Sequence, residues 1–149
     1  STHLPGTVRR EIQRLGASRV ILLGDETALS VEVEQQVRDL GLTVDRLAGD
    51  NRYATSVAVA QRSAQVGADD GVLWVATGRN WPDTLAAGPA AAHSGGVVLL
   101  VDGLDPAGSP ATLAHLDQHP PRRGWIAGGP DVVAPTVRVA IERRASGAG

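Results

Sequence analysis

The 149-residue chain contains no cysteine and no lysine, and both absences narrow its possible functions. Without cysteine it can form neither a disulfide, nor a thiolate nucleophile, nor a cysteine-ligated zinc site. All 14 basic residues are arginine, and the 16 acidic residues leave a net charge of −2. Domains that bind nucleic acid usually carry a clear excess of basic residues. We therefore expect no nucleic-acid partner.

Aromatic residues and long apolar segments are also scarce. The aromatic residues are Tyr53, Trp74, Trp81 and Trp125, too few for a broad aromatic platform that binds sugars. No apolar run approaches the roughly 20 residues that cross a bilayer. Residues 1–10 lack the basic and apolar regions of a signal peptide. We therefore expect neither a membrane span nor an export signal within the chain.

Five short apolar segments predict β-strands, at residues 20–23, 43–47, 72–77, 97–101 and 124–127. The segments 20–23 and 97–101 are continuously apolar, as in parallel strands buried on both faces. Helical spacing lies between the strands, and Pro89 should kink or break the helix that contains it. The alternation predicts an α/β fold with three layers, a mostly parallel sheet of about five strands flanked by helices.

The sequence also contains an internal repeat. Residues 4–7 and 19–24, followed by a helix, resemble residues 109–112 and 123–129 at an offset of 104 to 105 positions. Such self-similarity is typical of a tandem-repeat module. We expect residues 1–45 to be the closing half of a preceding repeat and residues 46–144 to be one complete repeat. Residues 145–149 are expected to form a flexible tail.

Glycines follow the predicted strands, where parallel α/β sheets bind their ligands. Gly78, Gly128 and Gly129 could let a ligand approach the backbone, or they could serve only the geometry of tight turns. The chain has neither a G-x-G-x-x-G nor a P-loop motif. Nucleotide chemistry is therefore not supported, and we expect no cofactor.

Residues 45–55 run from a strand through a tight turn into a helix. Arg52 would lie in the first helical turn, where the helix dipole disfavours a cation. It therefore needs a partner, which could be an acid such as Asp50 or Asp83, or an anionic ligand. In a second strand-to-helix turn, at residues 78–89, Trp81 is expected to fill the base of the loop, with stacking on a sugar as the alternative.

Catalytic chemistry finds little support in the sequence. His115 and His119 have the i, i+4 spacing of a zinc pair, but the glutamate of H-E-x-x-H is missing. His119 also precedes Pro120, where the helix should end. No G-x-S-x-G motif presents a serine nucleophile. We therefore predict no catalytic residue and no metal site.

Three motifs resemble the type 2 cell-wall-binding repeat of Gram-positive surface proteins. The pattern R-[LI]-x-G-x-[DN]-R-Y-x-T-[AS] matches residues 46–56. The pattern A-T-G-x-x-[FW]-x-D-[AT]-L-x-x-G-P-x-A matches residues 76–91, and apolar-x-G-G-x-x-x-[VI] matches residues 126–133. The departures are small, such as Asp25 in place of the second glycine in the first copy of the third motif.

The resemblance implies a non-catalytic anchor that holds a secreted protein noncovalently in the cell wall. Its partner would be an anionic secondary wall polymer or peptidoglycan, and its location extracellular. Family repeats assemble in threes, so we expect self-association as a trimer, with the helix at residues 85–92 in the interface. A bulky residue at Ala87 should then disrupt the oligomer more than the fold. The motifs supply the candidate ligand-binding residues, which are Arg46, Arg52, Tyr53, Thr55, Gly78, Arg79, Asp83, Gly128 and Gly129.

Two other functions remain open. The first is a peptidoglycan hydrolase of the N-acetylmuramoyl-L-alanine amidase type, which would use His115 and His119 with a third ligand. Some proteins that carry these repeats bear that name, although the activity belongs to a separate domain. The second is a structural module, in which the motifs only hold neighbouring modules together.

Overall fold

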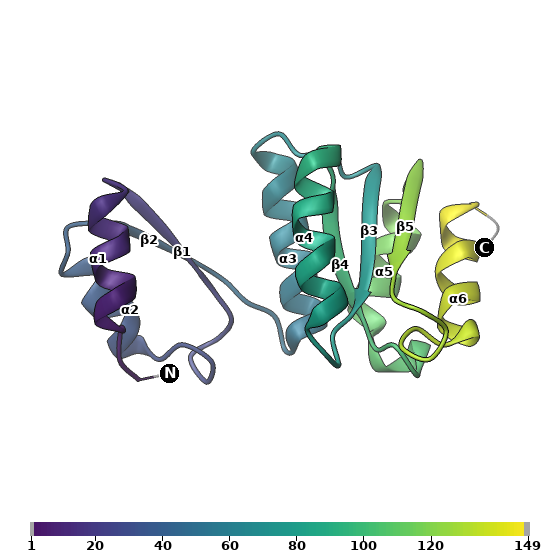
Figure 1. The fold of residues 1–149 in the computed structure, drawn as a ribbon, viewed down its shortest axis with the longest axis horizontal. Helices are drawn as coiled ribbons and strands as arrows, with labels where there is room; N and C mark the ends of the chain where they lie inside the picture. The colour runs from purple at the N-terminus through teal and green to yellow at the C-terminus, as the bar shows by residue number, and fades with distance from the viewer. Residues whose placement is uncertain (1, 148–149) are drawn as a thin grey trace. The chain divides into compact units, whose positions relative to one another are not determined.

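The computed structural model describes residues 2–147, and the chain divides into two compact units between Asp50 and Asn51. The first unit contains α1 (Gly6–Arg14), β1 (Arg19–Leu23), α2 (Val31–Arg38) and β2 (Thr43–Leu47). The second unit contains α3 (Arg52–Gln65), β3 (Val72–Thr77), α4 (Pro82–Ser94), β4 (Val97–Val101), the short 3-10 helix η1 (Pro106–Gly108), α5 (Pro110–Gln118), β5 (Arg123–Ala127) and α6 (Pro135–Ala145) (Figure 1).

The first unit has a two-stranded parallel sheet. Arg19 of β1 lies opposite Thr43 of β2, and Leu23 lies opposite Leu47. Helix α2 packs on this sheet because its apolar residues repeat at the spacing of one helical face. The buried residues of the resulting small core are Leu4, Val33 and Val37, against which Val20, Leu40, Leu42 and Val44 pack.

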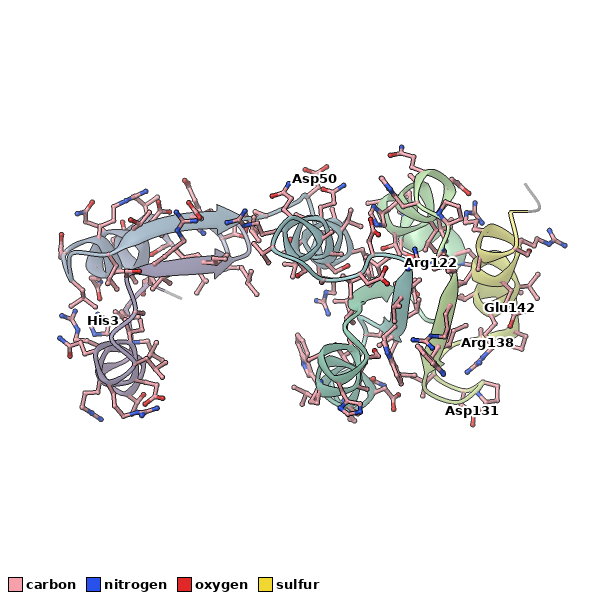
Figure 2. The ribbon with its side chains drawn as sticks, turned by 90° about the horizontal axis from the view of Figure 1, so that it is seen from above. His3, Asp50, Arg122, Asp131, Arg138 and Glu142 are labelled. Atoms are coloured by element: carbon pink, nitrogen blue, oxygen red, sulfur yellow. The ribbon has the colours of Figure 1, made fainter. Side chains whose placement is uncertain are left out.

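The second unit has three layers around a three-stranded parallel sheet in the order β4-β3-β5. Helix α4 covers one face, and α3, α5 and α6 lie on the other (Figures 1 and 2). Leu73 and Val75 of the central strand belong to the main core together with residues of α3, α5 and α6. On the α4 face, Trp74 stacks on Trp125 with ring centroids 4.9 Å apart. The Trp74 indole also donates a hydrogen bond to the Ser94 hydroxyl of α4.

The α/β class and the positions of all five strands are confirmed. Three strands have the predicted limits, and β1 and β5 each begin one residue earlier. The strands, however, form two sheets rather than one, because β2 pairs with β1 and not with β3. Apolar patterning marks a strand but does not say which edge it will pair with.

Three smaller expectations also meet the structure. Helix α4 continues through Pro89, so of the two predicted effects, a kink or a break, the break does not occur. Pro89 is exposed, where water can bind the carbonyl that the proline leaves without a partner. Helix α6 extends to Ala145, the first residue of the expected tail, whose last two residues lie outside the described part. No helix within residues 2–147 is both long enough and apolar enough to span a membrane.

Candidate functional site

The carboxyl ends of β3, β4 and β5 meet at one edge of the second unit's sheet. Ligands of parallel α/β folds bind at such edges, beside the helix N-termini. Four residues follow the ends of these strands, and three more come from the first turns of α3 and α4. We call this group the strand-end site; it consists of Arg52, Tyr53, Gly78, Arg79, Asp83, Asp102 and Gly128.

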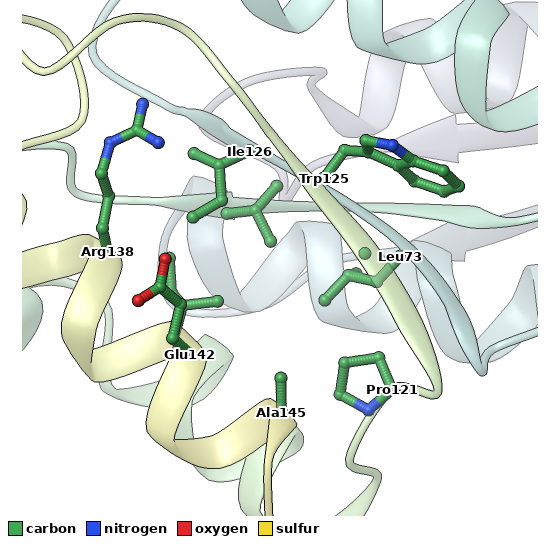
Figure 3. Close-up of a pocket in the computed structure, with 10 residues that line it drawn as sticks. Leu73, Pro121, Trp125, Ile126, Arg138, Glu142 and Ala145 are labelled. Atoms are coloured by element: carbon green, nitrogen blue, oxygen red, sulfur yellow. The ribbon is translucent and has the colours of Figure 1, made fainter.

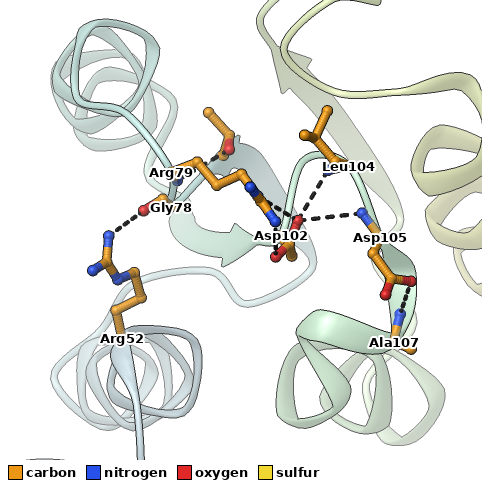
Figure 4. Close-up of polar contacts among 8 residues, drawn as sticks. Arg52, Gly78, Arg79, Asp102, Leu104, Asp105 and Ala107 are labelled. Atoms are coloured by element: carbon orange, nitrogen blue, oxygen red, sulfur yellow. Dashed lines mark hydrogen bonds and ion pairs between the residues drawn. The ribbon is translucent and has the colours of Figure 1, made fainter.

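Asp102 connects most of the polar contacts at the strand-end site (Figure 4). The Arg79 guanidinium donates from Nε to Oδ1 at 2.7 Å and from Nη2 to Oδ2 at 3.0 Å. The backbone N–H groups of Leu104 and Asp105 also donate to Oδ1. These hydrogen bonds, that of Arg79 first, hold the pKa of Asp102 below its usual value. Asp102 is therefore an ionised carboxylate at neutral pH, with only 9% of its surface exposed.

Arg52 binds a backbone carbonyl rather than a carboxylate. Its Nη1 donates to the Gly78 oxygen at 2.5 Å, across the gap between α3 and the end of β3 (Figure 4). Asn51 caps α3, since its Oδ1 accepts from the N–H groups of Tyr53 and Ala54. The expected ion pair of Arg52 with Asp50 or Asp83 is absent from the salt bridges of the described residues.

The glycines of the site differ in what they require. A Cβ on Gly78 would lie 2.7 Å from the Tyr53 ring, and one on Gly128 would lie 2.9 Å from the Asp83 carboxylate. Gly128 also has a φ of +111°, which side chains rarely adopt. Nothing lies within 4 Å of a Cβ placed on Gly129. Close approach therefore explains Gly78 and Gly128 but leaves Gly129 open to another role.

Burial also affects Tyr53, whose ring packs over Gly78. Desolvation raises the pKa of the Tyr53 phenol, and the nearby charge of Asp102 raises it further. Thr55 is half-buried on the same helix. The Tyr53 ring thus lies between α3 and the end of β3 rather than projecting into solvent.

Arg46 belongs to the first unit, whereas the strand-end site is formed by residues of the second. Its Nη2 donates to Oε2 of Glu34 at 2.8 Å, and its Nη1 donates to the Gly24 carbonyl at 2.8 Å. The motif at residues 46–56 is thus divided between the two units, with Arg46 at the end of β2 and Arg52 at the start of α3.

Two residues with structural roles at the site were missed by the sequence reasoning. Asp102 was not predicted, although a carboxylate directly after a continuously apolar strand is a signal for it. The Ser56 hydroxyl donates to the Tyr53 carbonyl and accepts from the Leu100 N–H, which ties α3 to β4. Serine inside an otherwise apolar helical stripe offers only a weak sequence signal.

Trp81 and the two histidines complete the list of predicted candidates. Trp81 is 65% exposed, so the expectation that it fills the base of its loop is wrong. His115 and His119 lie with ring centroids 4.8 Å apart, and burial lowers the pKa of His115. Residues 2–147 contain no group of three or more histidine, aspartate or glutamate side chains placed to hold a metal ion.

The strand-end site therefore combines exposed guanidinium groups with the hydrogen-bonded carboxylate of Asp102. It also contains two glycines, Gly78 and Gly128, against which neighbouring side chains pack closely. Arg52 is exposed, and half of the Arg79 side chain is exposed although it pairs with Asp102. Such an edge can donate several hydrogen bonds to a polar or anionic polymer.

Comparison with known proteins gives a family match and several relatives. The family model described as "Cell wall binding domain 2 (CWB2)" matches residues 46–138. An amidase enhancer of Bacillus subtilis (strain 168) is 33% identical over 99 residues, which cover 66% of this chain and 13% of the relative. N-acetylmuramoyl-L-alanine amidase LytC of the same organism is 28% identical over 102 residues, 68% of this chain and 20% of the relative. The chain thus spans a fifth or less of these two relatives.

Two solved structures from Clostridium difficile share the fold. Cwp6 superposes with a TM-score of 0.82 at 19% identity, covering 95% of this chain and 22% of that protein. Cwp8 superposes with a TM-score of 0.71 at 23% identity, covering 95% of this chain and 23% of that protein.

Proposed function

Because the chain belongs to the cell wall binding domain 2 family, we propose that it is a non-catalytic anchor that binds an anionic polymer of a Gram-positive cell wall. The protein that carries it would be secreted and held in the wall noncovalently. The observation that supports a specific site is the convergence of family-motif residues at the strand-end site. Arg52, Gly78 and Gly128 come from three separate motifs and lie at one edge of one sheet.

The charge of this edge indicates how the polymer is bound. Arg79 is already paired with Asp102, so Arg52 is the cation whose charge is least compensated within the site. One module therefore offers few charged contacts, and its affinity should be modest. Repeated modules on one protein, bound to one repeating polymer, raise the overall affinity through a high effective concentration. This arrangement suits an anchor.

We expect Arg52→Ala to weaken binding to purified wall sacculi by about fivefold, because a charge-assisted hydrogen bond is lost. Arg62→Ala is the matched control, since Arg62 lies in the last turn of the same helix and its only described partner is Gln65. Co-sedimentation with sacculi measures both, and thermal melting confirms that the variants are folded. Equal binding by the two variants would remove Arg52, and with it the strand-end site, from the proposal.

Acid extraction of the sacculi tests the polymer itself. Extraction removes anionic secondary polymers, so binding should be lost, and binding before extraction should weaken as salt rises from about 0.05 to 0.5 M. Undiminished binding to extracted sacculi would show that peptidoglycan is the ligand. The hydrolase alternative predicts the release of soluble muropeptides, and we expect none.

We also propose that the modules associate through the exposed side of α4, as a trimer. Leu85 is 70% exposed, whereas Ala87 is 1% exposed and packs inside the unit. The expectation that Ala87 tests the interface is therefore wrong, since a larger residue there would disturb the fold. Leu85→Ser should instead dissociate the oligomer in light scattering without changing the melting temperature. A native chain that remains monomeric at high concentration would contradict the proposal.

A further inference from the structure

Both units contain an equivalent pair of a β-strand and the helix that follows it. The surroundings of the pair in the first unit can therefore be compared with those in the second. Strand β1 and helix α2 correspond to β5 and α6 at a constant offset of 104 positions. Gly24 and Gly128, which follow the two strands, both have a φ of +111°. Val33 and Val37 of α2 correspond to Val137 and Ile141 of α6, and all four are buried. The correspondence therefore extends to conformation and packing.

The pairs differ in what covers them. In the first unit β2 runs parallel to β1, and its Val44 packs beside α2. In the second unit β5 ends the sheet, and within residues 2–147 no strand pairs with its outer edge. A groove of about 320 Å³ lies between β5 and α6, lined by Leu73, Ile126 and Ile141 among others (Figure 3). Gly124, which replaces Val20 of the first unit, enlarges it.

Handedness indicates which edge of β5 a strand would join. Helix α6 lies on the same face of the sheet as α3 and α5 (Figure 2). From β4 the chain passes through α5, on this face, to β5, which lies on the other side of the central strand β3. Because parallel crossovers are right-handed, a crossover through α6 continues in that direction and leads to the outer edge of β5.

The charges on the two helices are reversed. In the first unit Glu34 binds Arg46 of the covering strand and Arg38 of its own helix. The corresponding residues of α6 are Arg138 and Glu142, and both line the groove (Figure 3). Arg138 Nη2 donates to the Gly128 carbonyl, while its Nε donates to the Val133 carbonyl at 3.0 Å. In the first unit the equivalent carbonyl, that of Gly24, is bound by Arg46 of the strand β2. In the second unit the arginine that binds it, Arg138, comes from the helix instead.

We propose that the outer edge of β5 accepts an extended strand, parallel to β5, whose side chain opposite Ile126 is a carboxylate. Leu22 of β1 is the counterpart of Ile126. In the first unit the residue opposite Leu22 is Arg46 of β2. Apolar side chains of the added strand would fill the groove beside Ile141, as Val44 fills the space beside Val37. The β2 strand of a second copy does not fit, because its Arg46 would face Arg138.

The experiment appends a strand to the full chain after Gly149. One extended chain carries a second copy of residues 41–49, and the other carries the same copy with glutamate in place of its arginine. A scrambled extension is the control. Each extension is appended both to the native chain and to the double variant Arg138→Glu, Glu142→Arg. The melting temperature of the double variant without an extension shows whether it is folded. Hydrogen exchange of the β5 amides measures pairing, with no wall material present, so the result is independent of the proposed function.

On the native chain the glutamate extension should protect the β5 amides about tenfold more than the arginine extension, because opposite charges favour pairing and like charges oppose it. On the charge-reversed variant the preference should reverse. Equal protection by both extensions would overturn the charge rule. Protection no greater than with the scrambled extension would overturn the acceptor edge, and stronger protection by the arginine extension would show that a second copy's β2 is the better partner.

Discussion

Replacing Gly103 with alanine is expected to lower the free energy of unfolding of the second unit by about 3 kcal/mol, as severe overpacking does. Gly103 is buried, and a Cβ there would lie 2.0 Å from the Val132 carbonyl oxygen and 2.7 Å from the Thr77 hydroxyl. The obstacle is backbone, which cannot turn aside as a side chain can. The Gly103 carbonyl also accepts the Ala134 N–H at 2.7 Å, so a local shift would strain that hydrogen bond.

Gly129→Ala is the matched control, because Gly129 lies in the loop that Gly103 contacts and has open space around it. Its free energy of unfolding should change by less than about 0.5 kcal/mol, as for most surface substitutions. Urea denaturation of both variants measures the difference. If Gly103→Ala cost no more than Gly129→Ala, the loop before α6 would have to move without resistance. A stable Gly129→Ala variant that fails to bind sacculi would show that Gly129 serves the ligand.

The strands could be predicted from the sequence because each depends on a local property. Residues 72–77 are an apolar run between two glycines, and residues 97–101 are one that follows a glycine pair. Such runs form strands wherever they pair. Pairing itself depends on the edges that the rest of the chain leaves available. The strand at 43–47 was therefore found, but its position in a separate sheet beside β1 was not.

The candidate site was predicted in part for a similar reason. Motif spacing predicted that Arg52, Gly78 and Gly128 lie beside strand ends, and the structure places them at the carboxyl ends of β3 and β5 and at the start of α3. It also grouped Arg46 with them, and the structure places Arg46 in the first unit, where it pairs with Glu34. A spacing of six residues cannot reveal that a chain passes from one unit to the next between them.

Partners of charged groups were the least predictable part. Arg52 was expected to pair with an acid or to bind an anionic ligand. Its contact within the chain is instead the Gly78 carbonyl, which no sequence pattern distinguishes from other carbonyls. The arginine that does pair with an acid is Arg79, whose partner is the buried Asp102, 23 positions further along the chain. Long-range polar contacts of this kind depend on loop geometry, which the three-dimensional fold alone determines.

Asp102→Ala is expected to lower the free energy of unfolding of the second unit by about 2 kcal/mol, the sum of a lost charge-assisted pair and a lost loop cap. The carboxylate orders the turn after β4 by accepting from Leu104 and Asp105, and it also binds Arg79. Arg79→Ala should cost much less, because half of that side chain is exposed and the turn keeps its cap. Urea denaturation of the two single variants and the double variant measures the coupling.

The pH dependence of stability provides the independent check on Asp102. Arg79 holds the pKa of this carboxyl below its unfolded value, so the folded state binds its proton less readily than the unfolded state. The stability that the carboxylate contributes is therefore present above the ordinary aspartate pKa of about 4 and is lost as pH falls through the lower, folded-state pKa. Asp102→Asn removes this titration, and its stability should decline less between about pH 5 and pH 2.5 than that of the native chain. Asp105→Asn is the matched control, since it makes the same substitution in the same turn and removes no hydrogen bond to Arg79. Identical profiles for the native chain and Asp102→Asn would mean that the Arg79–Asp102 pair adds nothing to the stability of the strand-end site.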